Sequence, residues 1–293
     1  KGEHNTNGMT TMYQSSFKVD AAATGRWKSG FHTLPAGNTI KQLYSSRFRG
    51  GVIAMPDCSQ AEVRMLAAVA KENNLMQAFK DGLDIHKYVA GLCFHGGDMD
   101  AVTKAERKIA KGAVFGILYG EGIDSFAESF CQGDLNEANA IFDKFFTAFP
   151  GVKSYVDDSH ETYKKTGKAL LHITNRFIDL SGEAQRNGND TDRVLRQAQN
   201  FGIQAQTCDL TGMILYNVVQ FIKENNLKSK VMCFIHDSIE IDLHPDDTFR
   251  MLDMLKPLFN DYPWDTFGVP MASDIVFSAH MVAEIEVIEL IHD

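Results

Sequence analysis

The chain has 293 residues, of which 44% are hydrophobic and 23% are charged. These values are ordinary for a globular protein, so they exclude intrinsically disordered and collagen-like architectures. At ~150 residues per domain, the length predicts about two domains or one domain with a large insertion. The 29 basic and 38 acidic residues leave a net charge of −9. This excludes a surface that binds polyanions everywhere, although a local cleft can still be positive.

The five cysteines are scattered and never form a Cys-x-x-Cys pair. We therefore expect neither a disulfide framework nor a zinc ribbon, and a reducing, cytoplasmic location. No run of ~18 apolar residues predicts a membrane span, so we expect no membrane partner. The first residues are polar and the chain opens on Lys1 rather than Met, which predicts a fragment or a processed piece.

The first clear strand is expected at residues 51–55, bounded by Arg49-Gly50 and by Pro56-Asp57. Residues 60–70 then repeat apolar side chains at helical spacing, with Ser59 as the expected N-cap. Asp57 thus stands between a strand end and a helix start, where a side chain is held rigidly and remains exposed.

Residues 74–167 are almost entirely helical in pattern, with capping-box spacing at Thr103/Glu106 and at Asp134/Glu137. Short strands are expected at 169–173 and 177–180. A polar gap at 187–192 then opens a long helix, expected to bend near Gly202 and to end about residue 225.

A hairpin is predicted from two β-rich runs, 230–235 and 239–243, around a three-residue turn at 236–238. A helix at about 246–260 and a strand at about 272–277 close the pattern. The layout predicts an α+β fold, a small antiparallel sheet interrupted by a helical insertion. Asp57 and Asp237 are 180 positions apart, yet both motifs would lie on this sheet.

One face of the helix after Thr103 carries Arg107, Lys111 and Phe115 at four-residue intervals, with Tyr119 one turn further along. Such a face can grip a phosphate chain and stack a ring beside it. The spacing alone fits a solvated basic face equally well.

A second stripe consists of Arg193, Arg196, Asn200 and Gln204. Basic and amide groups together suit the minor groove of DNA, where they check the shape of a base pair without reading its sequence. For Arg193 we favour a solvated helix face.

Residues 107–120 read RKIAKGAVFGILYG, which fits the pattern RxxxKxxxFGxxYG and resembles the fingers helix of family A DNA polymerases. Four further segments resemble motifs of that family in the same order along the chain: TGR at 24–26, DCSQAEVR at 57–64, GLDIH at 82–86 and the HDS turn at 236–238. The resemblance covers nearly the whole chain.

The resemblance implies an antiparallel palm sheet with a helical fingers insertion: residues 1–72 and 191–293 as palm, and 73–190 as fingers. It implies template-directed DNA synthesis, in which two Mg²⁺ ions ~4 Å apart assist transfer of a nucleotide from a dNTP to a primer 3′ hydroxyl. A phage or another divergent source is expected, and hence the host cytoplasm if the source is viral.

The resemblance also assigns roles to single residues. The catalytic residues are Asp57, Asp237 and Lys111, and the two aspartates are the metal ligands. Glu62 would exclude a 2′-hydroxyl and Tyr119 would shape the pocket for the nascent pair. The incoming nucleotide would bind Arg107, Lys111, Phe115, Tyr119, Glu62, His86 and Gln60. The primer–template would lie near Arg26, Arg196, Asn200, Gln204 and His236.

The chain departs from the family pattern at Ser238, where family A enzymes usually have Glu. The HDS turn resembles single-subunit phage RNA polymerases, which share this palm, whereas Glu62 and Phe115-Gly116 favour DNA synthesis. A fragment of such an RNA polymerase stays an alternative, as does a non-catalytic DNA-binding subunit of a replication complex. Since only about twenty residues precede Thr24, we also expect an N-terminal polypeptide or subunit that supplies a thumb, with or without an exonuclease.

Overall fold

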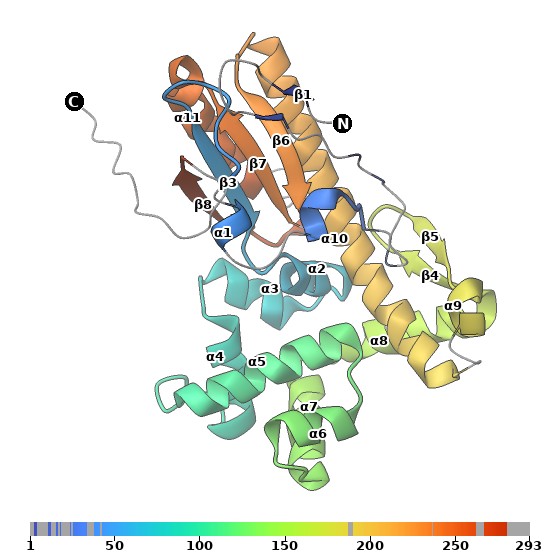
Figure 1. Cartoon of the computed structure of the whole chain (residues 1–293). Helices are drawn as coiled ribbons and strands as arrows, with labels where there is room; N and C mark the ends of the chain where they lie inside the picture. Colours follow the sequence, from blue (N-terminus) through green and yellow to red (C-terminus); the bar gives the residue numbers. More distant parts are fainter. Residues whose placement is uncertain are drawn as a thin grey trace.

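The computed structural model describes residues 43–186, 190–235, 237–261 and 267–279, together with residues 3, 4, 11, 12, 16, 18, 24, 26–33 and 38–41. A four-stranded antiparallel sheet in the order β6-β7-β3-β8 forms one end of the molecule (Figure 1). Its strands are β3 (Val52–Cys58), β6 (Lys230–Ile235), β7 (Ser238–Leu243) and β8 (Ser273–Ser278). Within this sheet the first strand in the sequence, β3, therefore pairs with the last two, β7 and β8.

Helices fill the chain between β3 and β6, and the predicted α+β class is confirmed (Figure 1). The first seven are α2 (Ala61–Val69), α3 (Asn73–Lys80), α4 (Ile85–Phe94), α5 (Lys104–Tyr119), α6 (Ile123–Phe130), α7 (Leu135–Ala148) and α8 (Pro150–Thr166). The small hairpin of β4 (Lys168–Leu171) and β5 (Arg176–Asp179), then α9 (Ser181–Arg186), separate them from the long α10 (Thr191–Glu224).

The remaining elements are short, apart from α11. They are β1 (Glu3–His4), β2 (Thr11–Met12), the 3-10 helix η1 (Gly30–Thr33), α1 (Asn38–Lys41), the 3-10 helix η2 (Pro245–Asp247) and α11 (Thr248–Asn260).

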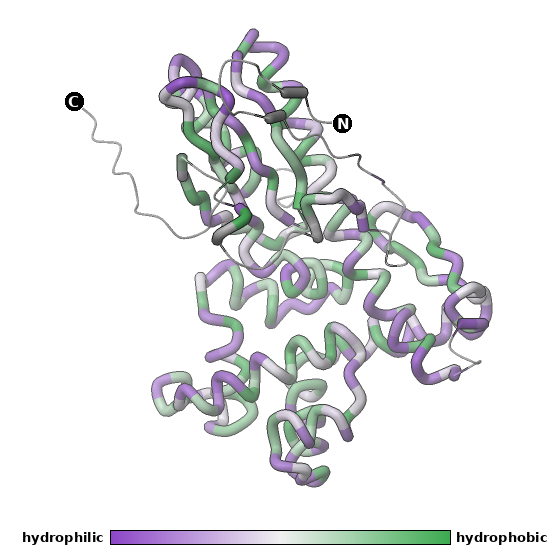
Figure 2. Tube along the Cα trace, in the orientation of Figure 1, coloured by the Kyte–Doolittle hydropathy of each residue, from purple (hydrophilic) through white to green (hydrophobic). Residues whose placement is uncertain are grey.

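One hydrophobic core joins the sheet to the helices. Ala54, Ile239 and Ile241 on the sheet belong to the same buried cluster as Ile214 of α10 and Leu255 of α11. In Figure 2 the strands of this sheet carry long hydrophobic stretches. At 34 residues, α10 is about 50 Å long and packs against α2, α5, α8, β4 and α11. It is the element that holds the sheet and the helical half in a fixed relation.

The central strand β3 is longer than the predicted 51–55, and Asp57 lies inside it rather than after it. The sequence suggests an early end because Pro56 has no N–H for a ladder. In the structure the β3–β7 register pairs residues 52–54 and then resumes at Asp57, while Pro56 stands opposite Ile275 of β8. The strand therefore continues past its proline.

Ser59 is not the N-cap of α2, so that prediction is wrong. The cap is Gln60, whose φ of 54° lies in the left-handed region, and no side chain caps this helix. The Ser59 N–H donates instead to the carbonyl of Ala272 at 2.8 Å, and the Ser59 carbonyl accepts from Arg64 Nε at 2.9 Å. Contacts with a segment 213 positions away thus decide the local geometry.

Among the other local predictions, the two N-caps are confirmed, whereas the hairpin turn differs from its prediction. The capping box of Thr103 and Glu106 is present with both hydrogen bonds, and Asp134 caps α7. The long helix runs without a break through Gly202, where a Cβ atom would lie 2.7 Å from the Tyr155 hydroxyl. Gly202 thus permits close packing against α8. Since Ser238 pairs with Ile235, the hairpin turn is shorter than the three residues predicted.

All five cysteines are free and buried, as expected for a chain without a disulfide framework. Among the helices that the structure describes, none combines the length and the apolar character needed to cross a bilayer.

Candidate active site

Two carboxylates meet where β3 and β7 lie side by side. Asp57 is on β3, and its register partner on β7 is Ser238, the residue after Asp237. The Cys58 N–H donates to the Asp237 carbonyl at 3.4 Å, which ties the turn to the strand. Partial burial, then repulsion from Asp237 and Asp274, raises the pKa of Asp57 to about 6. The predicted pair is therefore brought together, close enough for each charge to oppose the other.

The third acid, Asp274, was missed by the sequence reasoning. It lies on β8 directly opposite Asp57, and directly paired residues project from the same face of a sheet. The available signal was an acid within the apolar run of residues 273–277, but only the register shows which residue it faces. Within the described ranges no three His, Cys, Asp or Glu side chains gather closely enough to hold a metal ion.

The predicted face of α5 is formed as expected. Arg107 donates through Nε to Asp84 Oδ2 at 2.8 Å, and Asp84 is also the N-cap of α4. The Lys111 ammonium lies 5.8 Å from the centre of the Phe115 ring. The Phe115 and Tyr119 rings are nearly parallel, with centroids 5.8 Å apart. Cations and stacked rings therefore share one line along the helix.

His86 closes the other side of this face, with its ring centroid 5.7 Å from that of Phe115. Burial lowers the pKa of His86 to about 4; Asp84 opposes that shift, and Arg107 and Lys111 add to it. The imidazole is therefore neutral at physiological pH. Within the described part of the chain its buried Nδ1 has no hydrogen-bond partner.

Glu62 joins three segments of the chain. Its Oε2 accepts from the Tyr119 hydroxyl at 2.5 Å, and its Oε1 forms an ion pair with Arg26. Burial, and next the Glu62 bond, raise the pKa of Tyr119; Asp237 also contributes, so this network is close to the aspartate pair. Arg26, which we predicted to contact DNA, therefore forms an ion pair with Glu62, which we predicted to contact the sugar of the nucleotide.

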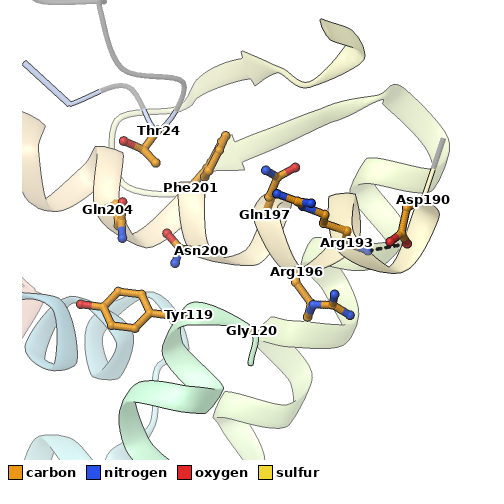
Figure 3. Close-up of a pocket in the computed structure, with 10 residues that line it drawn as sticks. All are labelled: Thr24, Tyr119, Gly120, Asp190, Arg193, Arg196, Gln197, Asn200, Phe201 and Gln204. Atoms are coloured by element: carbon orange, nitrogen blue, oxygen red, sulfur yellow. Dashed lines mark hydrogen bonds between the residues drawn. The ribbon is translucent and has the colours of Figure 1, made fainter. Parts of the chain in front are cut away.

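A polar cavity of about 510 Å³ lies between the end of α5 and α10 (Figure 3). It is lined by Thr24, Tyr119, Gly120, Asp190, Arg193, Arg196, Gln197, Asn200, Phe201 and Gln204. The buried Asn200 Oδ1 has no hydrogen-bond partner among the described residues. Arg193 is exposed, in agreement with the solvated helix face that we favoured, and it also lines the cavity. The predicted stripe of α10 thus converges with Tyr119.

A second cavity, of about 530 Å³, lies along α5 on the side of Lys111 and Phe115. Its other lining residues are Lys108, Gly112, Gly116, Tyr119, Glu121 and Phe130. Gln60 is exposed at the start of α2. His236 lies outside the described residues, so its predicted role has no structural counterpart here.

The sequence profile of DNA polymerase family A matches residues 4–281. The chain belongs to this family. Family A enzymes are metal-dependent DNA polymerases.

Individual relatives agree with the family. The chain is 32% identical over 227 residues to DNA polymerase I of Bacillus subtilis (strain 168), covering 76% of this chain and 25% of that protein. It is 30% identical over 286 residues to a DNA polymerase of Bacillus phage SP01, covering 93% of this chain and 30% of that protein. The chain therefore spans about a quarter to a third of the length of these relatives.

The fold is similar to that of the POL domain of Pol1 from M. smegmatis, solved in complex with DNA primer-template and dNTP. The TM-score is 0.81 at 23% identity, and the match covers 91% of this chain and 47% of that one. This likeness concerns the fold.

Proposed function

We propose that this chain carries out template-directed DNA synthesis, transferring a nucleotide from a dNTP to the 3′ hydroxyl of a primer. The observation that carries the proposal is the pairing of Asp57 with Asp237 beside the Glu62–Tyr119 network. Tyr119 belongs to the same helical face as Arg107 and Lys111, so carboxylates for metal ions and cations for a triphosphate stand on two sides of one site.

Asp57 and Asp237 are the proposed ligands of two Mg²⁺ ions. Carboxylate oxygens are hard donors that Mg²⁺ prefers, and the repulsion that raises the pKa of Asp57 is the kind that bound cations relieve. When bound, such ions activate the primer hydroxyl and steady the leaving pyrophosphate. The role of the protein itself is to hold the two carboxylates rigidly on neighbouring strands.

Arg107, Lys111, His86 and Gln60 are proposed to bind the triphosphate, with Lys111 as the catalytic cation. The neutral His86 can donate to a phosphate oxygen without adding charge, and its unpaired buried nitrogen supports this role. Phe115 and Tyr119 offer parallel rings against which a base can stack. Glu62 lies beneath them, where a buried carboxylate would oppose a 2′-hydroxyl.

The primer–template is proposed to run along the polar cavity, contacting Arg196, Asn200 and Gln204, with Arg26 and His236 beside it. The Arg26–Glu62 ion pair supports a location next to the nascent pair. We propose the palm at residues 1–72 and 191–293 and the fingers at 73–190, a division that follows the sheet and the helical insertion.

Since the chain spans about a quarter to a third of the relatives' length, we propose that an N-terminal polypeptide or subunit adds a thumb, with or without an exonuclease. The five free cysteines support a reducing cytoplasm as the place of action. Ser238 favours an RNA-synthesising alternative, whereas the buried Glu62 bonded to Tyr119 favours dNTPs.

Replacing Asp57 or Asp237 by Ala tests the proposal. Either change should lower nucleotide incorporation by at least ~10³-fold, since a two-ion clamp fails when one ligand is lost. Duplex binding should change little. The assay is primer extension with each dNTP and each ribonucleotide, with and without Mg²⁺, and Asp253→Ala on α11 is the control. Near-normal extension by Asp237→Ala would remove the hairpin from the catalytic site.

A further inference from the structure

Glu240 is a buried carboxylate that the proposed mechanism does not use, and it lies on β7 two residues after Ser238. Side chains alternate between the two faces of β7, so Ser238 and Glu240 share one face. Ser238 is the register partner of Asp57 and follows Asp237 directly. Its side chain therefore lies on the same face as that of Asp57, one of the two proposed metal ligands, and Glu240 is the next residue of β7 on that face.

Glu240 is only 5% exposed and is held by two donors. The Ser238 hydroxyl donates to Oε1 at 3.1 Å, and the Cys233 thiol donates to Oε2 at 3.2 Å. Burial raises the pKa of Glu240 to about 7, and these two hydrogen bonds oppose the shift by favouring the ionised form. Burying a carboxyl group costs free energy, so a buried Glu240 on the face that carries the site suggests a role in that site.

The bond to Glu240 fixes what Ser238 can offer to a ligand. A hydroxyl has one proton to donate and two lone pairs that accept. Since the Ser238 hydroxyl donates to Glu240, its oxygen is left with lone pairs that accept on its other side. A residue that only accepts resembles a carboxylate in its hydrogen bonding, although it carries no charge.

We propose that Glu240 is a positioning residue that makes Ser238 an acceptor for a water molecule of the metal site, at the one position of the turn where this chain departs from the family pattern. Glu240 acts through the Ser238 hydroxyl and does not touch the metal ions itself. The inference rests on the proposed function, because it takes Asp57 and Asp237 as the metal ligands.

The test is a double-mutant cycle with a readout that needs no turnover. Mn²⁺ binding is measured by electron paramagnetic resonance on the chain with a dideoxy-terminated primer–template. Ser238→Ala removes the acceptor, Glu240→Leu removes the group that orients it, and the double variant removes both. The Mg²⁺ concentration needed for half-maximal incorporation is measured in parallel on extendable primers.

Each single variant should weaken Mn²⁺ binding about fivefold, the effect of one net hydrogen bond of ~1 kcal/mol. The double variant should be no weaker than the weaker single variant, because both changes break the same link. Glu240→Gln keeps an acceptor oxygen for the hydroxyl and should restore most of the binding. Ser238→Thr keeps the hydroxyl and should behave like the parent.

Cys233→Ala is the matched control, since it removes the other hydrogen bond of Glu240 and leaves Ser238 alone; Mn²⁺ binding should stay within twofold of the parent. Parent-like binding by Ser238→Ala, or effects of Ser238→Ala and Glu240→Leu that add fully, would overturn the inference. If Glu240→Leu does not fold, the comparison of Ser238→Ala with Ser238→Thr still decides. A parent chain that binds no Mn²⁺ would overturn the proposed function as well. If the parent binds Mn²⁺ and incorporates nucleotides, but the effects of the two substitutions on Mn²⁺ binding add, only this inference is overturned.

Discussion

Glu62 shows how much of this site depends on single contacts between distant residues. Its two oxygens engage the Tyr119 hydroxyl, 57 positions away, and the Arg26 guanidinium, 36 positions away. A buried carboxylate that lost both partners would carry an uncompensated charge. The packing of the Tyr119 ring and the position of Arg26 are therefore coupled through one side chain, and so is sugar selection if Glu62 has its proposed role.

Lys111→Ala should reduce kcat/KM for the dNTP by about 10- to 100-fold, the range expected for one charge-assisted hydrogen bond to phosphate. Duplex affinity should change less than twofold, because Lys111 lies next to Phe115, which is proposed to contact the incoming nucleotide rather than the duplex. Steady-state incorporation and a separate duplex-binding titration measure the two effects. Lys104→Ala, at the exposed start of the same helix, is the control. A variant with weaker DNA binding and unchanged nucleotide use would assign this face to DNA.

Glu62→Ala should raise the ratio of ribonucleotide to deoxynucleotide incorporation roughly tenfold or more, since it removes the group that we propose to oppose a 2′-hydroxyl. The overall rate should fall, because Tyr119 and Arg26 lose their shared partner. Competition between dNTP and rNTP on one primer gives the ratio. Tyr119→Phe breaks only the hydrogen bond and should change the ratio less. An unchanged sugar preference in Glu62→Ala would revive the RNA-polymerase alternative.

At the scale of elements, the junction between α5 and α10 determines the shape of the polar cavity. Gly120 ends α5 with a φ of 67°, and a Cβ there would lie 2.6 Å from Arg196 Cβ. Gly167 ends α8 with a φ of 69° and has open space around it. These two caps share a backbone conformation and differ in what surrounds them.

Gly167→Ala should therefore lower the free energy of unfolding by ~1 kcal/mol, the cost of a left-handed alanine. Gly120→Ala pays the same cost and must also push Arg196 away, so its loss should exceed that of Gly167→Ala by at least ~1 kcal/mol. Urea unfolding measures both. Only Gly120→Ala should weaken primer–template binding, because only that change moves the helix bearing Asn200. If the two variants lose the same free energy of unfolding, Arg196 and α10 can move away from Gly120→Ala at no measurable cost.

The elements that the sequence predicts well are those whose signals are local. The capping box at Thr103, the spacing along α5 and the hairpin runs all involve residues within a few turns of one another. Errors arose where a distant segment decides. Ser59 bonds the carbonyl of Ala272 instead of capping α2, and β3 passes through Pro56 because β8 pairs with it. Asp274 was missed for the same reason, since its place beside Asp57 exists only in the register.

At the scale of the molecule, the acidic balance and the length of the chain bear on how DNA is held. The net charge is −9, and the cations that face the site belong to α5 and α10. Duplex affinity comes mostly from neutralised phosphates, and each such contact increases the salt dependence of binding. The relatives are three to four times longer than the matching segment, and the proposed N-terminal polypeptide would add contacts of that kind.

We therefore expect the 293-residue chain alone to bind primer–template weakly and to dissociate after a few additions. With Z phosphate contacts the slope of log K against log salt is about −0.9Z, so a small Z gives a shallow slope. The measurements are duplex affinity between 50 and 200 mM salt and product length under single-hit conditions with a DNA trap. Co-purification from the native source, followed by mass measurement, tests for the proposed N-terminal polypeptide, whose addition should steepen the slope and lengthen the products. A monodisperse 293-residue chain that extends long primers unaided would show that palm and fingers suffice.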